Sequence, residues 1–153
     1  MQNNSLKNKK IIISAGASGI GLAITKTCLD RGATVLATDI NNKFINSLKK
    51  NSKYKKKLFL YNFDASEEND VSNFFKSVKS KFKKIDCLIN NVGIAGPTGT
   101  LEKLSSKDWE KTLKTNVISH FYFTKLAIPL LKNNKGGSII NISSGAGVLG
   151  FPL

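Results

Sequence analysis

Apolar residues cluster in five short runs along the chain, and amphipathic segments separate them. The first run reads KKIIISA and is continuously apolar between lysines and glycines, a pattern typical of a strand that is buried on both faces. The other four runs are similar in length and are bounded by charged or turn-forming residues. Strands are therefore predicted at 9–15, 33–39, 57–64, 85–90 and 138–143.

The segments between these runs carry apolar residues at helical spacing. The first such segment follows a glycine-rich turn and ends at Gly32. Residues 66–82 carry one apolar stripe along a predicted helix, whose first turn is acidic. A short helix is predicted at 41–50. Ser105 is predicted to cap a long helix that carries Trp109, Leu113, Val117 and Phe121 and runs on to the glycines at 136 and 137.

Strands that alternate with helices in this way predict βαβ units and a parallel sheet. A chain of 153 residues is long enough for one domain with a buried core and too short for two ordinary ones. The sequence thus predicts a single α/β domain over residues 1–153. Its fold class is a doubly wound parallel sheet with strand order 3-2-1-4-5.

Composition excludes several classes of protein. Apolar residues make up 41% of the chain and charged residues 22%, the balance of a soluble globular protein. No apolar run approaches the roughly 18–20 residues that span a bilayer. The run at 11–13, which follows several lysines, is also too short for a secretory signal. A cytoplasmic location is the expectation.

The two cysteines do not suggest a metal or disulfide site. Cys28 and Cys87 lie far apart in apolar segments, neither belongs to a CxxC pair, and the single histidine, His120, cannot complete a zinc site with them. Both are predicted to be small buried residues.

The net charge of +14 is the least ordinary feature of the composition. A basic chain can bind nucleic acid, because neutralised phosphates release counterions. However, every basic residue except Arg31 is lysine. Proteins that recognise bases and phosphates rely on the bidentate hydrogen bonds of arginine. A solvated lysine surface is the preferred interpretation, and nucleic-acid binding is the lesser alternative.

The first strand-to-helix turn reads SAGASGIG and has the features of a phosphate-binding turn. Glycines there let the backbone approach a diphosphate closely, and the following helix directs free N–H groups and the positive end of its dipole toward it. Asp39 ends the second strand and can accept hydrogen bonds from both ribose hydroxyls of an adenosine, while repelling a 2′-phosphate. NAD is therefore favoured over NADP. The alternative for Asp39 is an ordinary loop carboxylate or helix cap.

At this point the motifs resemble those of the short-chain dehydrogenases/reductases, which share a Rossmann-type fold. The spacing Gly16, Gly19, Gly21 resembles the TGxxxGxG turn of that family, with Ser14 at the threonine position and Ala15 where the family usually has glycine. The segments YNFDAS, NNVG, KTNV and GSIINISS agree with further family motifs in order and spacing. The resemblance implies cofactor contacts at Ser14, Gly16, Ser18, Gly19, Ile20, Gly21, Asp39, Ile40, Asp64, Ala65, Asn90, Asn91 and Gly93.

The resemblance also implies a catalytic role for Asn116 and Ser144. Asn116 matches the family's helix asparagine, which anchors a water in a proton relay. Trp109, Leu113, Asn116 and His120 share one helix face, so a structural tie by a buried amide is the plainer alternative. Ser144 aligns with the serine that polarises the substrate carbonyl. His120 is predicted to be a partly buried packing residue.

The family's general acid, a tyrosine followed four residues later by a lysine, has no counterpart in the chain. Tyr54, Tyr61 and Tyr122 are not followed by lysine at that spacing, and the expected tyrosine would fall a few residues beyond Leu153. The sequence is therefore interpreted as a C-terminally truncated domain that lacks the last strands and is inactive alone. Residues 138–143 would form an exposed apolar sheet edge.

Three interpretations of the whole remain open. The chain is the N-terminal part of an NAD(P)-dependent oxidoreductase that interconverts a secondary alcohol and a ketone, or a complete NAD-binding regulatory module, or a basic remnant that binds nucleic acid. The full-length parent would be a homodimer or homotetramer acting on a small-molecule alcohol or ketone. Lys43 is the candidate for a 2′-phosphate contact if the cofactor is NADP.

Overall fold

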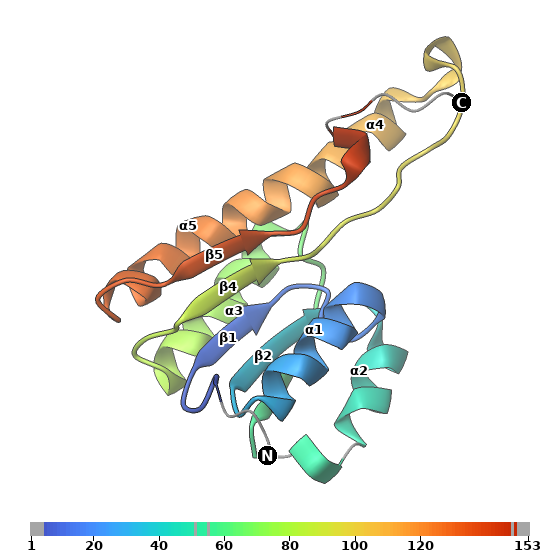
Figure 1. Cartoon of the computed structure of the whole chain (residues 1–153). Coiled ribbons are helices and arrows are strands. Elements are labelled where there is room, and N and C mark those ends of the chain that lie inside the picture. The colour runs from blue at the N-terminus through green and yellow to red at the C-terminus, as the bar shows by residue number, and fades with distance from the viewer. Residues whose placement is uncertain (1–4, 51, 55, 148, 150–153) are drawn as a thin grey trace.

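The structure is a computed structural model, and it describes residues 5–50, 52–54, 56–147 and 149. Its centre is one parallel sheet with the order β3-β2-β1-β4-β5, as predicted (Figure 1). The strands are β1 Lys10–Ile13, β2 Thr34–Asp39, β3 Leu58–Asn62, β4 Cys87–Asn90 and β5 Ser138–Asn141.

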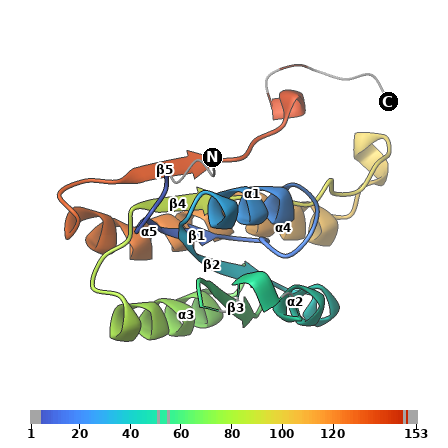
Figure 2. The same ribbon diagram turned by 60° about the horizontal axis from the view of Figure 1, so that its bottom comes forward.

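Among the described residues there are five α-helices, namely α1 Gly19–Asp30, α2 Asn42–Lys49, α3 Glu68–Lys81, α4 Ser106–Leu113 and α5 Ser119–Lys132. Four of them cover the two faces of the sheet, and α4 extends beyond it. Helices α1 and α2 lie on one face, and α3 and α5 pack together on the other, as Figures 1 and 2 show. The doubly wound architecture is thereby confirmed.

Parallel pairing brings the carboxyl ends of the strands to one edge of the sheet. Ile13, the last residue of β1, pairs with Ala37 and with Ile89, close to the ends of β2 and β4. Asp39 ends β2 opposite Asn62. The polar residues that follow the strands therefore converge on the crevice where ligands bind in open α/β sheets.

The predicted long helix is not one regular α-helix. Residues Lys114–Ile118 form a π turn between α4 and α5, in which the Ser119 N–H donates to the Lys114 carbonyl, five residues earlier. Such a turn leaves a backbone carbonyl without its usual partner, and the Ser119 hydroxyl donates to the Thr115 carbonyl at 2.6 Å. Hydrophobic spacing carries no sign of this extra residue.

Large apolar side chains on this helical segment face solvent. Trp109, Leu113, Val117 and Phe121, named here the helix seam, are 45–59% exposed. The prediction that the last strand exposes apolar residues is confirmed, since Ile139 and Ile140 of β5 are 39% and 45% exposed.

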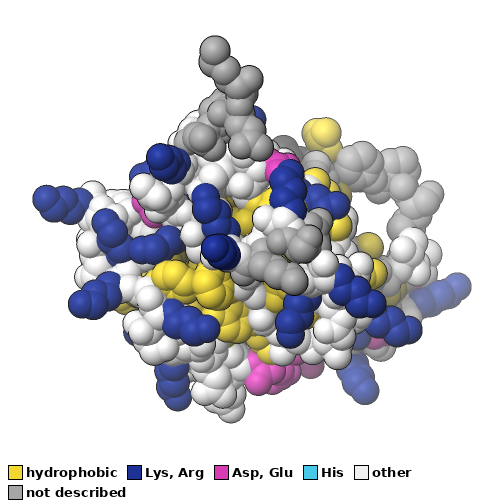
Figure 3. Space-filling view, turned by 90° about the horizontal axis from the view of Figure 1, so that it is seen from below, with side chains coloured by type: hydrophobic (Ala, Val, Ile, Leu, Met, Phe, Trp, Pro, Cys, Tyr) yellow, Lys and Arg dark blue, Asp and Glu magenta, His cyan; other side chains and the backbone are white. Residues whose placement is uncertain are grey.

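Lysine side chains occupy much of the surface, as the preferred interpretation of the charge predicts. Figure 3 views the molecule from below, and lysines surround a group of hydrophobic side chains there. In the part of the chain that the structure describes, no helix combines the length and apolar character needed to cross a membrane.

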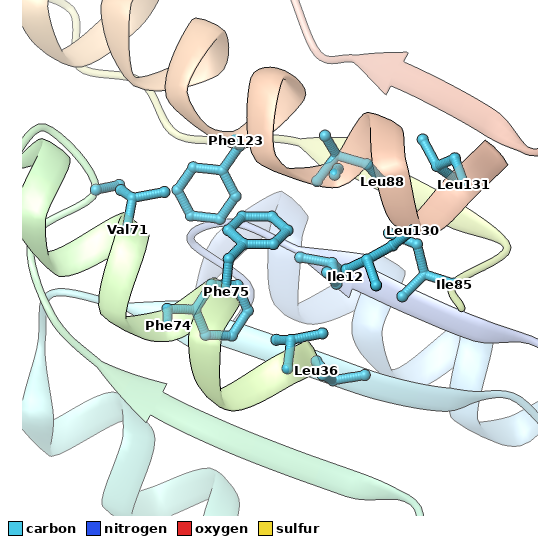
Figure 4. Close-up of a cluster of buried hydrophobic side chains, with 13 residues drawn as sticks. Ile12, Leu36, Val71, Phe74, Phe75, Ile85, Leu88, Phe123, Leu130 and Leu131 are labelled. Atoms are coloured by element: carbon cyan, nitrogen blue, oxygen red, sulfur yellow. The ribbon is translucent and has the colours of Figure 1, made fainter. Parts of the chain in front are cut away.

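The larger core lies between the sheet and the α3–α5 face. The rings of Phe75 in α3 and Phe123 in α5 pack edge to face, with their centroids 5.7 Å apart. They lie over Ile12 and Leu88 of the central strands (Figure 4). A second cluster, on the α1 face, contains both cysteines. Cys28 is buried and Cys87 partly so, and burial raises the pKa of the Cys87 thiol to about 11.

Candidate functional site

The turn between β1 and α1 is fastened to the neighbouring strands by hydrogen bonds. The Ser14 hydroxyl accepts the Asn91 N–H at 2.9 Å and the Val92 N–H at 3.2 Å. The Gly16 N–H donates to the Thr38 carbonyl, and the Thr25 hydroxyl donates to the Gly16 carbonyl. Ser14 and Gly16 therefore hold the turn against β2 and the residues that follow β4. Their side-chain and backbone groups already have hydrogen-bond partners within the protein.

Two positions in the turn require their particular residues. A Cβ on Gly21 would collide with the Ala15 carbonyl oxygen and lie 2.6 Å from the Asn91 Nδ2, so only glycine fits there. Gly19 has φ of +50° and open space where a Cβ would lie. Ala15 stands at φ of +48°, a conformation that costs a residue with a Cβ about 1 kcal/mol.

The N-terminus of α1 offers backbone donors that have no hydrogen-bond partner among the described residues. The first helical bond is that of the Leu22 N–H to the Ser18 carbonyl, so the N–H groups of Gly19, Ile20 and Gly21 precede the helical hydrogen bonding. The Ser18 side chain makes no capping bond, and no acidic residue lies in the first turn. These donors and the positive end of the helix dipole suit an anionic group.

A cavity of about 290 Å³ lies at the carboxyl ends of the strands, close to the lower end of the usual range for ligand sites, about 300–1,000 Å³. Ala15 of the turn reaches it. Its walls also include five of the predicted cofactor residues, namely Asp39, Ile40, Asp64, Ala65 and Gly93. Ser18 and Gly19 line a separate hollow between the turn and α2.

Asp39 is held in place at the floor of this cavity. One carboxylate oxygen accepts the Ala17 N–H at 3.2 Å and the other accepts the Asn41 N–H at 3.0 Å. The side chain is buried but still lines the cavity, so lone pairs remain for a ligand. The glycine turn and the second strand are thus joined through the carboxylate that the sequence singled out.

Asn62 is a supporting residue that the sequence analysis did not identify. Its side-chain amide donates to the carbonyl of Asp39 at 2.8 Å and to that of Ile40 at 3.0 Å. It thereby fixes the loop that carries both predicted contacts. The available signal was a lone polar residue near the end of an apolar strand, two residues before Asp64.

The opposite wall of the cavity is basic, which was also not predicted. Lys111 and Lys114 line it, and the Lys114 Nζ lies 2.6 Å from Glu67 at the start of α3. The hydrogen bond that Lys114 donates to Glu67 raises the pKa of Lys114. Asp64 accepts bonds from the backbone and hydroxyl of Ser66, which leaves its second oxygen for other donors.

The two asparagines after β4 differ in their surroundings. The Asn91 amide donates to the carbonyls of Ser14 and Ala15 and so supports the turn. Asn90 is fully buried and donates to Thr124 of α5 and Asn141 of β5, while its Oδ1 has no hydrogen-bond partner among the described residues. Neither residue is among those that line the cavity, and their cofactor contacts stay predictions.

Asn116 lies in the π turn and ties the loop after β4 to the helix. Its Oδ1 accepts the Ile94 N–H at 2.8 Å, and its Nδ2 donates to the Ile94 carbonyl at 2.9 Å. This amide is half-buried and its partner lies in a loop, and the proton-relay role of Asn116 stays a prediction. His120 is partly buried, as predicted, and its Nε2 donates to the Val92 carbonyl at 2.8 Å.

Ser144 lies in the segment after β5. It is exposed, and its hydroxyl accepts the Ala146 N–H at 3.2 Å. It is not among the residues that line the cavity, so its catalytic role stays a prediction.

Comparison with known proteins gives a consistent result. A family model described as "short chain dehydrogenase" matches residues 9–153. The chain is 32% identical to a 3-oxoacyl-[acyl-carrier-protein] reductase FabG of Thermotoga maritima, covering 96% of the chain and 60% of that protein. It is also 32% identical to a 3beta-hydroxysteroid dehydrogenase 2 of Eggerthella lenta, covering 95% of the chain and 57% of that protein.

Solved structures agree in fold. A short-chain dehydrogenase from Streptomyces avermitilis superposes with a TM-score of 0.87 at 23% identity, over 95% of this chain and 52% of that one. The structure described as ElxO with NADP bound gives the same score at 28% identity, over 95% and 59%. The chain thus spans somewhat more than half the length of the relatives that it matches.

Proposed function

The chain belongs to the short-chain dehydrogenase/reductase family, and we propose that it binds NAD(H) as the nucleotide-binding part of an oxidoreductase. The reaction that we propose is the interconversion of a secondary alcohol and a ketone. One observation carries the proposal. The turn that leads into the uncapped N-terminus of α1 reaches, at Ala15, a cavity that Asp39 also lines, and the Asp39 carboxylate accepts the Ala17 N–H of that turn.

The residues present fit a dinucleotide. A diphosphate would accept bonds from the free N–H groups of Gly19, Ile20 and Gly21, where open space beside Gly19 leaves room for it. Asp39 would accept the two adenosine ribose hydroxyls, and Asp64 and Ala65 would border the adenine. When bound, the nicotinamide would supply or accept the hydride.

The remaining predicted residues would position the reacting groups. Asn116 fixes the loop at Ile94, which forms part of the cavity wall, and Ser144 would donate its hydroxyl hydrogen to the substrate oxygen. The proton itself would pass through the family's tyrosine and lysine, a pair that these 153 residues do not contain at that spacing. Nucleotide binding is therefore the property to measure on this chain.

Charge supports NAD over NADP. A buried carboxylate at Asp39 would repel a 2′-phosphate, although a similar fold has been solved with NADP bound. Lys43, on the exposed first turn of α2, is the candidate contact for that phosphate. A small alcohol or ketone substrate, a cytoplasmic location and a homodimer or homotetramer complete the proposal.

Substitution of Asp39 tests the proposal directly. In titrations followed by NADH fluorescence, Asp39→Ala should weaken NADH binding about tenfold, because two charge-assisted hydrogen bonds to the ribose hydroxyls are lost. The preference for NADH over NADPH should become smaller, because the repulsion of the 2′-phosphate is lost as well. Asp39→Asn should keep more of the bonds to Ala17 and Asn41 and still admit NADPH more readily.

Glu110→Ala, which removes an exposed carboxylate on α4, is the matched control and should bind as the parent does. Equal affinity of the parent and both Asp39 variants for NADH would refute the assignment of the ribose site. Failure of the parent itself to bind NADH or NADPH would refute the proposed function.

A further inference from the structure

The free edge of the sheet at β3 is an open hydrogen-bonding surface. Among the described strands β3 is the last on its side, with β2 as its only neighbour. The Lys57 carbonyl and the Phe63 N–H bond to β2. Backbone direction alternates along a strand, so the N–H and C=O groups of Leu58, Leu60 and Asn62 point away from the sheet.

An apolar groove runs beside this edge. A cavity of about 490 Å³ lies between α2 and β3, with Ile45, Leu58 and Leu60 as its apolar wall. Leu58 and Leu60 are only partly buried. Asn42, Asn46, Asn62 and Lys49 form the polar rim. An extended chain along the edge would place every second side chain in this groove.

The segment that contains the edge is rich in lysine, and one of these lysines, Lys53, is paired with Asp30 of α1 at 2.6 Å. Residues 40–63, which include α2 and β3, contain seven lysines and no carboxylate, half of the net charge of the whole chain. Figure 2 shows β3 between α2 and α3, and Figure 3 shows that lysines outnumber acidic side chains on the face seen from below. On the α3 side, the Lys81 Nζ lies 5.4 Å from the centre of the Phe59 ring.

We propose that the β3 edge binds an extended acidic peptide segment of another protein by strand addition. Outward backbone groups would pair with the peptide, the groove would take its apolar side chains, and the lysines would pair with its carboxylates. Charge decides between the possible occupants. A second copy of this chain carries the same +14 and would be repelled, and lysines along an edge disfavour pairing with neutral strands.

Nucleic acid is the weaker fit for this surface. The groove walls are aliphatic rather than aromatic, so they offer no stacking surface for bases, and the basic side chains of the segment are all lysine. The unpaired backbone groups of Leu58 and Leu60 have a counterpart in a peptide strand but not in a base or sugar.

The test uses the full chain and a fluorescein-labelled peptide of alternating glutamate and leucine, followed by fluorescence anisotropy. The parent should bind it with a dissociation constant in the micromolar range and bind a lysine–leucine peptide at least about tenfold more weakly. The same acidic peptide, N-methylated at alternate residues on its pairing side, should lose binding, because strand pairing needs those N–H groups.

Charge reversal locates the site. Lys49→Glu combined with Lys56→Glu should weaken acidic-peptide binding by about tenfold or more. Lys103→Glu combined with Lys107→Glu makes the same charge change near α4 and should leave binding nearly unchanged. NADH titration of both double variants should match the parent, which shows that they fold.

Three outcomes would overturn the proposal. They are an N-methylated peptide that binds as tightly as its parent peptide, equal losses in the two double variants, and tighter binding of oligothymidylate than of the acidic peptide at equal salt. The last would identify a nucleic-acid surface instead. Absence of peptide binding at about millimolar concentration would also refute it.

Discussion

Helices α1 and α4 begin in opposite ways. At α4, the Ser105 hydroxyl accepts the Asp108 N–H and donates to the Asp108 carboxylate, which also lies in the first turn. At α1, Ser18 occupies the same cap position, but its side chain makes no such bond and the first turn has no acid. One helix satisfies its own N-terminus, and the other leaves it for a ligand.

This difference distinguishes helix N-termini whose capping stabilises the fold from those whose N–H groups stay available for a ligand. A capped N-terminus contributes about 1 kcal/mol to stability, whereas an uncapped one forgoes that contribution. The donors left open at α1 follow the turn whose Ala15 lines the cavity of Asp39, while those of α4 lie in a solvent-facing segment. Substitutions at the two helix starts should therefore affect stability and nucleotide binding in opposite proportions.

The largest effect is expected at Gly21. Gly21→Ala should lower the free energy of unfolding by about 2–3 kcal/mol, measured by urea denaturation, because the added methyl collides with the Ala15 carbonyl and the Asn91 amide. NADH binding should be lost with the shape of the turn. Gly19→Ala is the control. It meets open space and should lose only about 1 kcal/mol, from its left-handed conformation. Equal losses at the two glycines would contradict the packing argument.

A carboxylate at the α1 cap should exchange binding for stability. Ser18→Asp should raise the free energy of unfolding by about 0.5–1 kcal/mol, because its carboxylate caps the helix and interacts favourably with the positive end of the helix dipole. It should weaken NADH binding about tenfold through repulsion of the diphosphate. Ser18→Asn, which caps without charge, should lose less affinity. Unchanged NADH affinity in Ser18→Asp would place the diphosphate elsewhere.

The smallest effect is expected from Ser18→Ala, with Ser105→Ala as its comparison. Ser105→Ala should cost about 1 kcal/mol of stability, measured as a lower urea midpoint, and leave NADH affinity unchanged. Ser18→Ala should change stability by no more than a few tenths of a kcal/mol, because no cap is lost. A large destabilisation by Ser18→Ala would show that α1 is capped after all, and the contrast between the helices would disappear.

The order of strands and helices could be predicted from the sequence because the central strands and helices such as α3 bury apolar residues at a regular spacing. Strand order follows from the βαβ handedness and the resemblance. Strand ends could not be placed as well. The run predicted at 9–15 is β1 Lys10–Ile13, since Ser14 and Ala15 already turn toward the glycines. The helix after the turn begins at Gly19, earlier than its apolar spacing suggests.

The sequence identifies those candidate site residues whose side-chain type and position along the chain are informative by themselves. Asp39 is recognisable as a carboxylate at the end of a buried strand, and it lines the cavity. Asn62 and Lys114 were missed because their importance depends on which loops the fold brings together. The π turn was missed because one extra residue in a helix changes hydrogen bonding without altering apolar composition.

That π turn also shapes the helix seam. Four residues of α-helix overshoot a full turn by about 40°, so a side chain at every fourth position would wind steadily round the helix. Trp109, Leu113, Val117 and Phe121 have that spacing, and the wider turn between Leu113 and Ser119 reverses part of the winding. The ridge of the helix seam is therefore straighter than it would be on an unbroken α-helix.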